Sequence, residues 1–189
     1  DYYYHIPINI NIMNYIPYDN NYISTTQIIN KIINNNNNNN NYEDRYTKKN
    51  ILDSEILYGK DLQSPASYNI LNEIIPNNKY KKILEIGCGL GGNCNYLSNK
   101  YINSDIIGID ISKNMIDICN ERNTNSKIKY IESDYKDLIL INKFNLIFCR
   151  DVCMYLYTEQ KYKFLKKVRS ELEDNGIFVL IDYCVGNII

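Results

Sequence analysis

Short apolar runs alternate with helical apolar spacings along most of the chain. A run such as Lys82–Ile86, which stops at glycines, is typical of a strand buried in a parallel sheet. Five strands are predicted in this way, at residues 82–86, 105–110, 127–132, 144–149 and 177–182. Helices are predicted before and between them, at residues 67–75, 92–100, 113–122 and 158–172. This alternation predicts an α/β fold in which right-handed crossovers build a parallel sheet covered on both faces.

The first 41 residues have a different character. They consist mainly of Asn, Ile and Tyr, and they end in an uninterrupted run of asparagines at residues 34–41. Such a low-complexity polar tract does not bury enough apolar surface to offset the entropy lost on ordering. We therefore expect a disordered arm at residues 1–41 and one domain at residues 42–189.

Composition narrows the classes of function. The formal net charge is -1, with acids and bases mixed throughout, so no basic surface for nucleic acid is expected. No apolar run approaches the roughly 20 residues of a spanning helix, and no signal peptide is recognisable. We expect a cytoplasmic protein with a small-molecule partner. The six cysteines are predicted to be reduced and packed, and the only histidine, His5, lies in the arm, so no metal site is expected.

The candidate chemistry lies at the ends of the predicted strands. Residues 83–92, ILEIGCGLGG, join the first strand to its helix. Glycines there let the backbone approach a ligand closely, and the helix N-terminus presents N–H groups to it. Because Gly87, Gly89 and Gly92 also have the spacing of dinucleotide-binding loops, the loop alone leaves both NAD and S-adenosylmethionine open.

Three acidic residues favour S-adenosylmethionine. Glu85 precedes the first glycine of the loop, where a carboxylate would repel a pyrophosphate but attract the ammonium and sulfonium groups of S-adenosylmethionine. Asp110 closes the second strand and is well placed to accept hydrogen bonds from ribose hydroxyls. Asp134 follows the third strand, where an adenine amino group is expected.

With these residues in place, the segment at residues 59–184 resembles the class I methyltransferases, and most closely the phosphoethanolamine N-methyltransferases. The likeness rests on ILEIGCGLGG (83–92), GIDIS (108–112), CRDVCMYL (149–156) and LIDYC (180–184). The first two segments are shared by many class I enzymes, whereas the last two are narrower. The resemblance implies a Rossmann-like fold and S-adenosylmethionine as the cofactor.

The resemblance also implies which residues line the cofactor pocket. They are Ser64, Glu85, Gly87 and Gly89 around the methionine part, Asp110 and Ile111 at the ribose, Asp134 and Tyr135 beside adenine, and Arg150 in the wall of the pocket.

For catalysis, the resemblance points to three residues, and Tyr183 is implied to line the pocket for the substrate phosphate. Tyr46 corresponds to a tyrosine in an N-terminal lid, and Asp151 to the acid of an Asp–His pair. The histidine of that pair is replaced here by Tyr155. A tyrosine hydroxyl ordinarily ionises near pH ~10 and is a poor substitute for imidazole. Reduced activity, a different acceptor or no activity is therefore expected.

Three functions follow as hypotheses. The first is N-methylation of a small amine such as phosphoethanolamine, a step of phospholipid biosynthesis. The second is a catalytically impaired cofactor-binding protein or a fragment, because such folds normally continue after the fifth strand and this sequence stops at Ile189. The fold is thus interpreted as truncated there. The third is an NAD-dependent oxidoreductase, which Glu85 disfavours.

Overall fold

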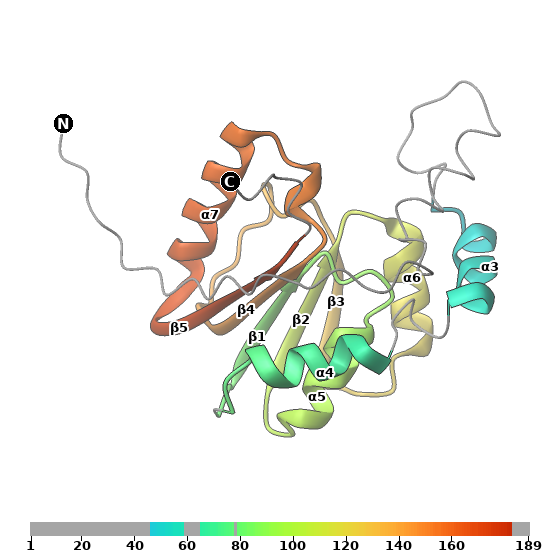
Figure 1. Cartoon of the computed structure of the whole chain (residues 1–189), viewed down its shortest axis with the longest axis horizontal. Helices are drawn as coiled ribbons and strands as arrows, with labels where there is room; N and C mark the ends of the chain where they lie inside the picture. Colours follow the sequence, from blue (N-terminus) through green and yellow to red (C-terminus); the bar gives the residue numbers. More distant parts are fainter. Residues whose placement is uncertain (1–45, 59–64, 78, 183–189) are drawn as a thin grey trace, which may run out of the picture.

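The computed structural model describes residues 46–58, 65–77 and 79–182. In this part of the chain a five-stranded sheet has the order β3-β2-β1-β4-β5, and every neighbouring pair is parallel (Figure 1). The strands are β1 (Lys82–Ile86), β2 (Asp105–Asp110), β3 (Ile128–Glu132), β4 (Phe144–Arg150) and β5 (Leu172–Ile181). The helices are α3 (Lys48–Tyr58), α4 (Pro65–Ile74), α5 (Gly92–Lys100), α6 (Lys113–Arg122), the short 3₁₀ helix η2 (Cys153–Tyr155) and α7 (Thr158–Glu171). The predicted α/β, Rossmann-like architecture is confirmed.

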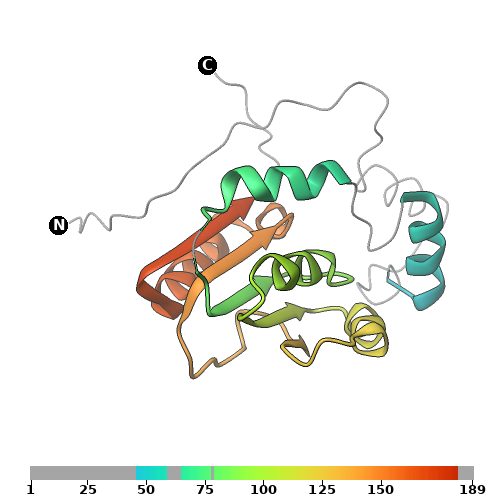
Figure 2. The ribbon, with the colours of Figure 1, turned by 90° about the horizontal axis from the view of Figure 1, so that it is seen from below.

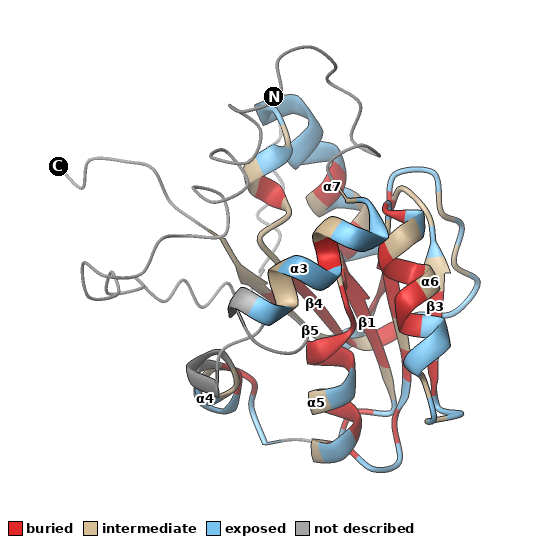
Figure 3. Ribbon diagram, turned by 90° about the vertical axis from the view of Figure 1, so that its right-hand side faces the viewer, coloured by how far each residue is buried: buried red, intermediate tan, exposed pale blue. Residues whose placement is uncertain are grey.

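Helices cover both faces of the sheet, and alternate strand residues supply the two cores. One face packs against α4, α5 and α6, in a buried cluster that includes Leu71, Leu97, Ile116 and Phe148. The other face packs against α7, in a cluster that includes Phe164. Figure 3 shows that buried positions are concentrated on the central strands and on the inward faces of the helices. Because side chains alternate along a strand, each apolar run serves both cores.

The start of β5 differs from the prediction. The strand begins at Leu172, directly after α7, rather than at Ile177. Leu172 pairs with Phe144, and the regular register resumes only at Ile177 opposite Leu146, so a bulge lies between the two pairs. The sequence pattern placed Leu172 at the end of the preceding helix, but Leu172 starts the strand and is buried in the core beneath α7. Burial of that one side chain extends the pairing.

Two helical segments were not predicted, α3 and η2. Helix α3 lies beside α6 at the edge of the sheet far from β5 (Figure 2). Arg122 of α6 holds Glu55 of α3 through two hydrogen bonds of 2.8 and 2.7 Å. The helix is therefore fixed by contacts distant in sequence, which local apolar spacing does not reveal.

The five cysteines in the described ranges are all buried and none forms a disulfide, which confirms the expectation of reduced thiols for them. Across the same ranges, no helix combines the length and the apolar character that crossing a membrane requires. The predicted arm at residues 1–41 lies outside the described residues, as do Ser64 and Tyr183.

Candidate functional site

The glycine loop between β1 and α5 is tied to the end of β2. The N–H groups of Gly87 and Cys88 both donate to the carbonyl oxygen of Ile109, at 2.8 and 2.9 Å. The N–H of Gly89 donates to Asp110 Oδ2 at 2.8 Å, and the thiol of Cys119 donates to the Gly89 carbonyl at 3.2 Å. The loop is thus held on both sides of Gly89 before any ligand binds.

Gly87, Gly89 and Gly91 all have positive φ, but their surroundings differ. A Cβ at Gly87 would lie 2.3 Å from Val152 Cγ2, and one at Gly91 would lie 2.4 Å from the hydroxyl oxygen of Tyr130. A Cβ at Gly89 would meet nothing within 4 Å. Gly89 therefore faces open space, as a backbone segment that a ligand approaches closely should.

Asp110 organises the edge of this space. Its Oδ1 accepts a hydrogen bond from the N–H of Ser112 at 2.9 Å, while its backbone carbonyl accepts one from Ser133 N–H at 2.9 Å. Burial raises the pKa of Asp110, and the N–H groups of Ser112 and Gly89 act in the opposite direction. Each carboxylate oxygen can accept more than one hydrogen bond, so Asp110 retains the capacity to bind hydroxyl groups.

Glu85 is buried below the loop, with 1% of its surface exposed. Its Oε1 accepts a hydrogen bond from Asn93 Nδ2 at 2.8 Å, and its Oε2 accepts one from Cys94 Sγ at 2.9 Å. Burial raises the pKa of Glu85 to about 7, against the lowering effect of these hydrogen bonds and of Arg150. Both carboxylate oxygens are thus engaged, so Glu85 presents no open carboxylate face to a ligand.

Asn93 was not foreseen as part of the site. Its amide oxygen is buried and has no hydrogen-bond partner in the described structure, although its amide nitrogen holds Glu85. A buried acceptor left without a donor costs roughly 1–3 kcal/mol. The same side chain thus holds the buried carboxylate of Glu85 and carries an unsatisfied acceptor. The contact between these two residues, eight positions apart, depends on how α5 packs against β1.

The carboxylate of Asp134 lies past the end of β3, in a tight turn. Its Oδ1 accepts the N–H of Lys136 at 3.0 Å, and its Oδ2 pairs with Lys136 Nζ at 2.7 Å. The lysine is largely exposed, and such surface pairs contribute about 0–1 kcal/mol. The carboxylate can therefore exchange this partner for another donor at little cost.

Tyr135, expected beside adenine, has its ring turned into the core. The ring is 7% exposed and packs edge-on against Phe164 of α7 at a centroid distance of 5.3 Å. Its hydroxyl donates to Glu171 Oε2 at 2.5 Å. Only the backbone of Tyr135 is therefore left to approach a ligand, and a contact with adenine would have to use it.

Arg150 ends β4 next to the glycine loop, and Asp151 directly follows the strand. Arg150 Nε lies 3.4 Å from Asp151 Oδ2, and the N–H of Asp151 donates to the Ile181 carbonyl at 2.9 Å. Asp151 has a φ of 56°, which is uncommon for a residue other than glycine. Burial raises the pKa of Asp151, Arg150 lowers it, and Asp182 raises it. The strained backbone and the perturbed carboxyl mark this corner as a functional candidate.

Tyr155 follows on η2, with 58% of its surface exposed. Ile111, after Asp110, is also half exposed, at 50%. Ile111 follows the end of β2 and Tyr155 follows the end of β4, so both exposed side chains lie at the same edge of the sheet.

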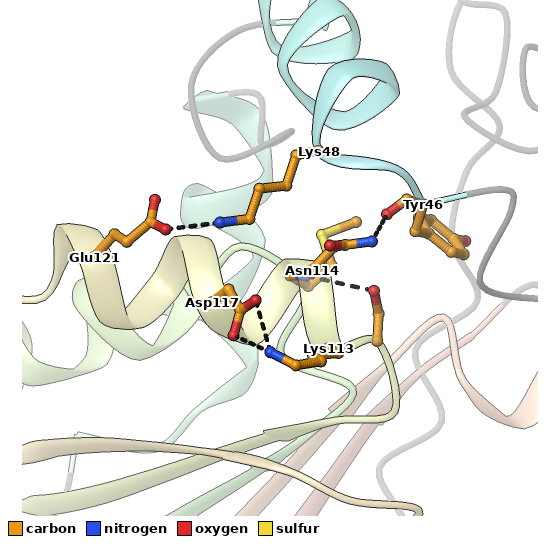
Figure 4. Close-up of polar contacts among 8 residues, drawn as sticks. Tyr46, Lys48, Lys113, Asn114, Asp117 and Glu121 are labelled. Carbon is orange, nitrogen blue, oxygen red and sulfur yellow. Dashed lines mark hydrogen bonds and ion pairs between the residues drawn. The ribbon is translucent and has the colours of Figure 1, made fainter.

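Tyr46 lies against α6. Its carbonyl oxygen accepts a hydrogen bond of 2.8 Å from Asn114 Nδ2, and nearby Lys48 Nζ pairs with Glu121 at 2.7 Å (Figure 4). The Tyr46 side chain packs against a buried cluster made of Ile51, Leu90, Met115 and Ile118. Since Leu90 belongs to the glycine loop, Tyr46 lies close to that loop.

Parallel strands bring their carboxyl ends to one edge, so Glu85, Asp110, Asp134 and Arg150 converge there. The strand order reverses between β1 and β4, and ligands of open α/β sheets bind in the crevice at such a point. The fold is Rossmann-like, and the candidate binding residues lie at the carboxyl edge of its sheet.

Comparisons with known proteins agree with this description. The family described as "Methyltransferase domain" matches residues 83–176. The phosphoethanolamine N-methyltransferase of Plasmodium falciparum is 32% identical over 146 residues, which cover 75% of this chain and 54% of that protein. Phosphoethanolamine N-methyltransferase 1 of Arabidopsis thaliana is 27% identical over 150 residues, covering 74% of this chain and 29% of that protein.

A solved structure has the same fold. Phosphoethanolamine N-methyltransferase 2 of Haemonchus contortus, in complex with S-adenosyl-L-methionine, superposes with a TM-score of 0.68 at 22% identity, covering 76% of this chain and 34% of that one. The chain is similar in sequence to methyltransferases, the phosphoethanolamine N-methyltransferases among them, and it has the same fold. It spans about half the length, or less, of these relatives.

The surroundings of two loop glycines lead to a first prediction. Gly89→Ala should lower the free energy of unfolding by about 1–2 kcal/mol, the cost of placing a Cβ at positive φ. Gly91→Ala should lower it by more, because the new Cβ also meets the Tyr130 hydroxyl. Urea unfolding of the two variants checks this order. Equal losses would contradict it, and Tyr130→Phe should relieve part of the Gly91→Ala loss.

The buried Glu85 leads to a prediction on pH. Its pKa is raised from 4.5 to about 7 by burial, so the folded state binds more protons than the unfolded state between these values. The stability from this group is fully present below pH 4.5 and is lost as pH rises through 7, by up to about 3 kcal/mol. Glu85→Gln removes the dependence. The variant should be more stable than the wild type at pH 8.5, with the difference shrinking toward pH 5, in urea unfolding at both pH values. A constant difference would contradict the assignment.

Proposed function

We propose that the protein binds S-adenosylmethionine and transfers its methyl group to a small amine, with phosphoethanolamine as the first candidate. The observation that carries the proposal is the bond from Gly89 N–H to Asp110 Oδ2, beside the open face of Gly89. The family match and the names of the relatives support it.

Each end of the cofactor has a candidate set of contacts in this chain. At the ribose, Asp110 would accept hydroxyl hydrogen bonds, with Ile111 alongside. At adenine, Asp134 would accept a hydrogen bond from the amino group in place of Lys136, beside the backbone of Tyr135. The residues proposed for the methionine part are Ser64, Glu85, Gly87 and Gly89, with Arg150 in the wall.

Glu85 gives the proposed pocket its preference for a positively charged ligand. In S-adenosylmethionine the methyl group is bonded to a sulfonium sulfur. When the methyl group is transferred, the rest of the cofactor leaves as a neutral thioether. A carboxylate below the loop attracts that cation and the ammonium group, whereas it would repel a pyrophosphate. A dinucleotide is therefore disfavoured by the same residue, and NAD serves as the contrasting ligand in the test below.

The proposed amine site lies around Asp151, at the β4 corner. An ammonium substrate must lose a proton before its nitrogen can attack, and correct alignment of the nucleophile can contribute roughly 7–11 kcal/mol. Asp151 would pair with the ammonium group and orient it, and its raised pKa brings it closer to a group that accepts a proton. Tyr46 is proposed as the covering tyrosine, Tyr155 as a neighbour of Asp151, and Tyr183 as a contact for the substrate phosphate.

A second candidate function is cofactor binding with little or no turnover. It is favoured by one observation, the largely exposed hydroxyphenyl ring of Tyr155 at the position where the resemblance leads one to expect a histidine. The two candidates share the cofactor and differ in methyl transfer.

Binding is tested by calorimetric titration of the full chain with S-adenosylmethionine, S-adenosylhomocysteine and NAD. We predict micromolar binding of the first two, because hydrogen bonds hold the glycine loop and Asp110 together beside the open side of Gly89. Asp110→Ala should abolish it, and Asp105→Ala, at the opposite end of the same strand, should leave it unchanged. Folded protein that binds only NAD, or none of the three, would contradict the proposal.

Methyl transfer is tested with phosphoethanolamine and radiolabelled S-adenosylmethionine. The first function predicts labelled product, and Asp151→Asn should lower kcat/KM at least about tenfold while leaving cofactor affinity within about twofold, since a neutral amide cannot hold an ammonium ion as strongly. Asp105→Asn, at an exposed acid at the opposite end of the sheet from the site, is the control. Cofactor binding without any labelled product would favour the second function.

A further inference from the structure

The turn that carries Asp134 is clamped to α7 at both of its ends. The turn spans residues 134–138, and it is closed by hydrogen bonds from the N–H groups of Asp137 and Leu138 to the Asp134 carbonyl, at 3.0 and 3.2 Å. Its first clamp is the Tyr135 hydroxyl, which donates to Glu171 Oε2. Its second is the Leu138 carbonyl, which accepts a hydrogen bond of 2.6 Å from Lys167 Nζ.

The two clamps form a single network. Lys167 Nζ also donates to Glu171 Oε1 at 2.7 Å, one helical turn away, and lies 4.9 Å from the centre of the Tyr135 ring. Both oxygens of Glu171 are thus used, one for the start of the turn and one for the lysine that holds its end. Glu171 is 7% exposed, so these are charge-assisted hydrogen bonds in a largely desolvated place.

The network holds a short turn with two charged side chains of a neighbouring helix. An exposed loop between two strands is usually held by its own backbone and is mobile. Here a buried carboxylate and a half-buried ammonium group are committed to it, and burying two charges is unfavourable unless their geometry is good. A position that must be held accurately explains that commitment better than stability alone.

We propose that Glu171 and Lys167 are positioning residues for the adenine end of the cofactor pocket, acting through Tyr135 and Leu138 on the carboxylate of Asp134. This inference rests on the proposed function and extends it to residues of α7 that are far from the site in sequence. It also gives the buried ring of Tyr135 a role. The ring anchors the turn, while the Asp134 carboxylate accepts a hydrogen bond from the adenine amino group. Removing the anchor should weaken recognition of the adenine amino group rather than binding as a whole.

The test compares S-adenosylhomocysteine with S-inosylhomocysteine, in which the amino group of the base is replaced by an oxygen. In the wild-type full chain, the loss of a hydrogen bond to a carboxylate should weaken binding of the inosine analogue by roughly 10- to 100-fold. Tyr135→Phe keeps the ring and its contact with Phe164 but removes the hydroxyl. We expect its discrimination to fall to about threefold or less, with Lys167→Met showing the same loss.

Tyr101→Phe is the matched control. Tyr101 is also buried, and its hydroxyl group donates a hydrogen bond of 3.3 Å to the Pro76 carbonyl, away from the site. The Tyr101→Phe chain should discriminate between the two ligands as the wild type does, although its Tm changes by about as much as that of Tyr135→Phe. This comparison separates positioning from a general loss of stability.

Each outcome has a distinct meaning. If the Tyr135→Phe chain discriminates like the wild type, the positioning role is overturned. If the wild type binds S-adenosylhomocysteine without discriminating, the positioning role is overturned and cofactor binding stands, whereas failure to bind either ligand overturns the proposed function as well. Should the variants not fold, hydrogen exchange in the wild type decides. The amides of Asp137 and Leu138 should then exchange as slowly as those of β3, and exchange at the rate of an open loop would overturn the clamp.

Discussion

The carboxylate of Asp110 accepts hydrogen bonds from the N–H groups of Gly89 and Ser112, and the site is built outward from this group. The first bond fixes the glycine loop, and the second fixes the start of α6. The Asp110 carbonyl meanwhile accepts the N–H of Ser133, which brings the end of β3 to the same place. The glycine loop, the start of α6 and the end of β3 are therefore joined at one residue, beside the open side of Gly89.

The same edge of the sheet carries features that are unfavourable for stability. Glu85 is buried with a pKa raised to about 7, Asn93 keeps an acceptor without a donor, and Asp151 has a positive φ. Costs of this kind gather at functional sites, where the surrounding structure maintains them. In this protein the surroundings are the two well-packed cores of the sheet, which hold β1 and β4 between them.

The sequence predicted the parts of the fold that depend on local pattern. The bounds of β1, β2, α5 and α6 agree with the expectations, because a buried parallel strand is a continuous apolar run and a helix has its own apolar spacing. The predicted start of β5 did not agree with the structure, because polar residues separate Leu172 from the rest of its strand. Helix α3 was missed because its partners on α6 lie more than sixty residues away.

For the site, the strand ends were predictable and the side-chain directions were not. Glu85, Asp110 and Asp134 lie at successive ends of parallel strands, which the alternation of strands and helices already implies. The inward turn of Tyr135, and the contacts of Asn93 and Glu171, depend on how α5 and α7 pack on the sheet. No spacing along the chain contains that information.

The most direct test of the account is a crystal structure of the full chain with S-adenosylhomocysteine. We predict that a ribose hydroxyl lies within hydrogen-bond distance of the Asp110 carboxylate, with the ligand passing over Gly89 and the bond from Gly89 to Asp110 intact. A ligand bound elsewhere, or a loop that must leave Asp110 to admit it, would contradict the claim that Asp110 organises the pocket in advance.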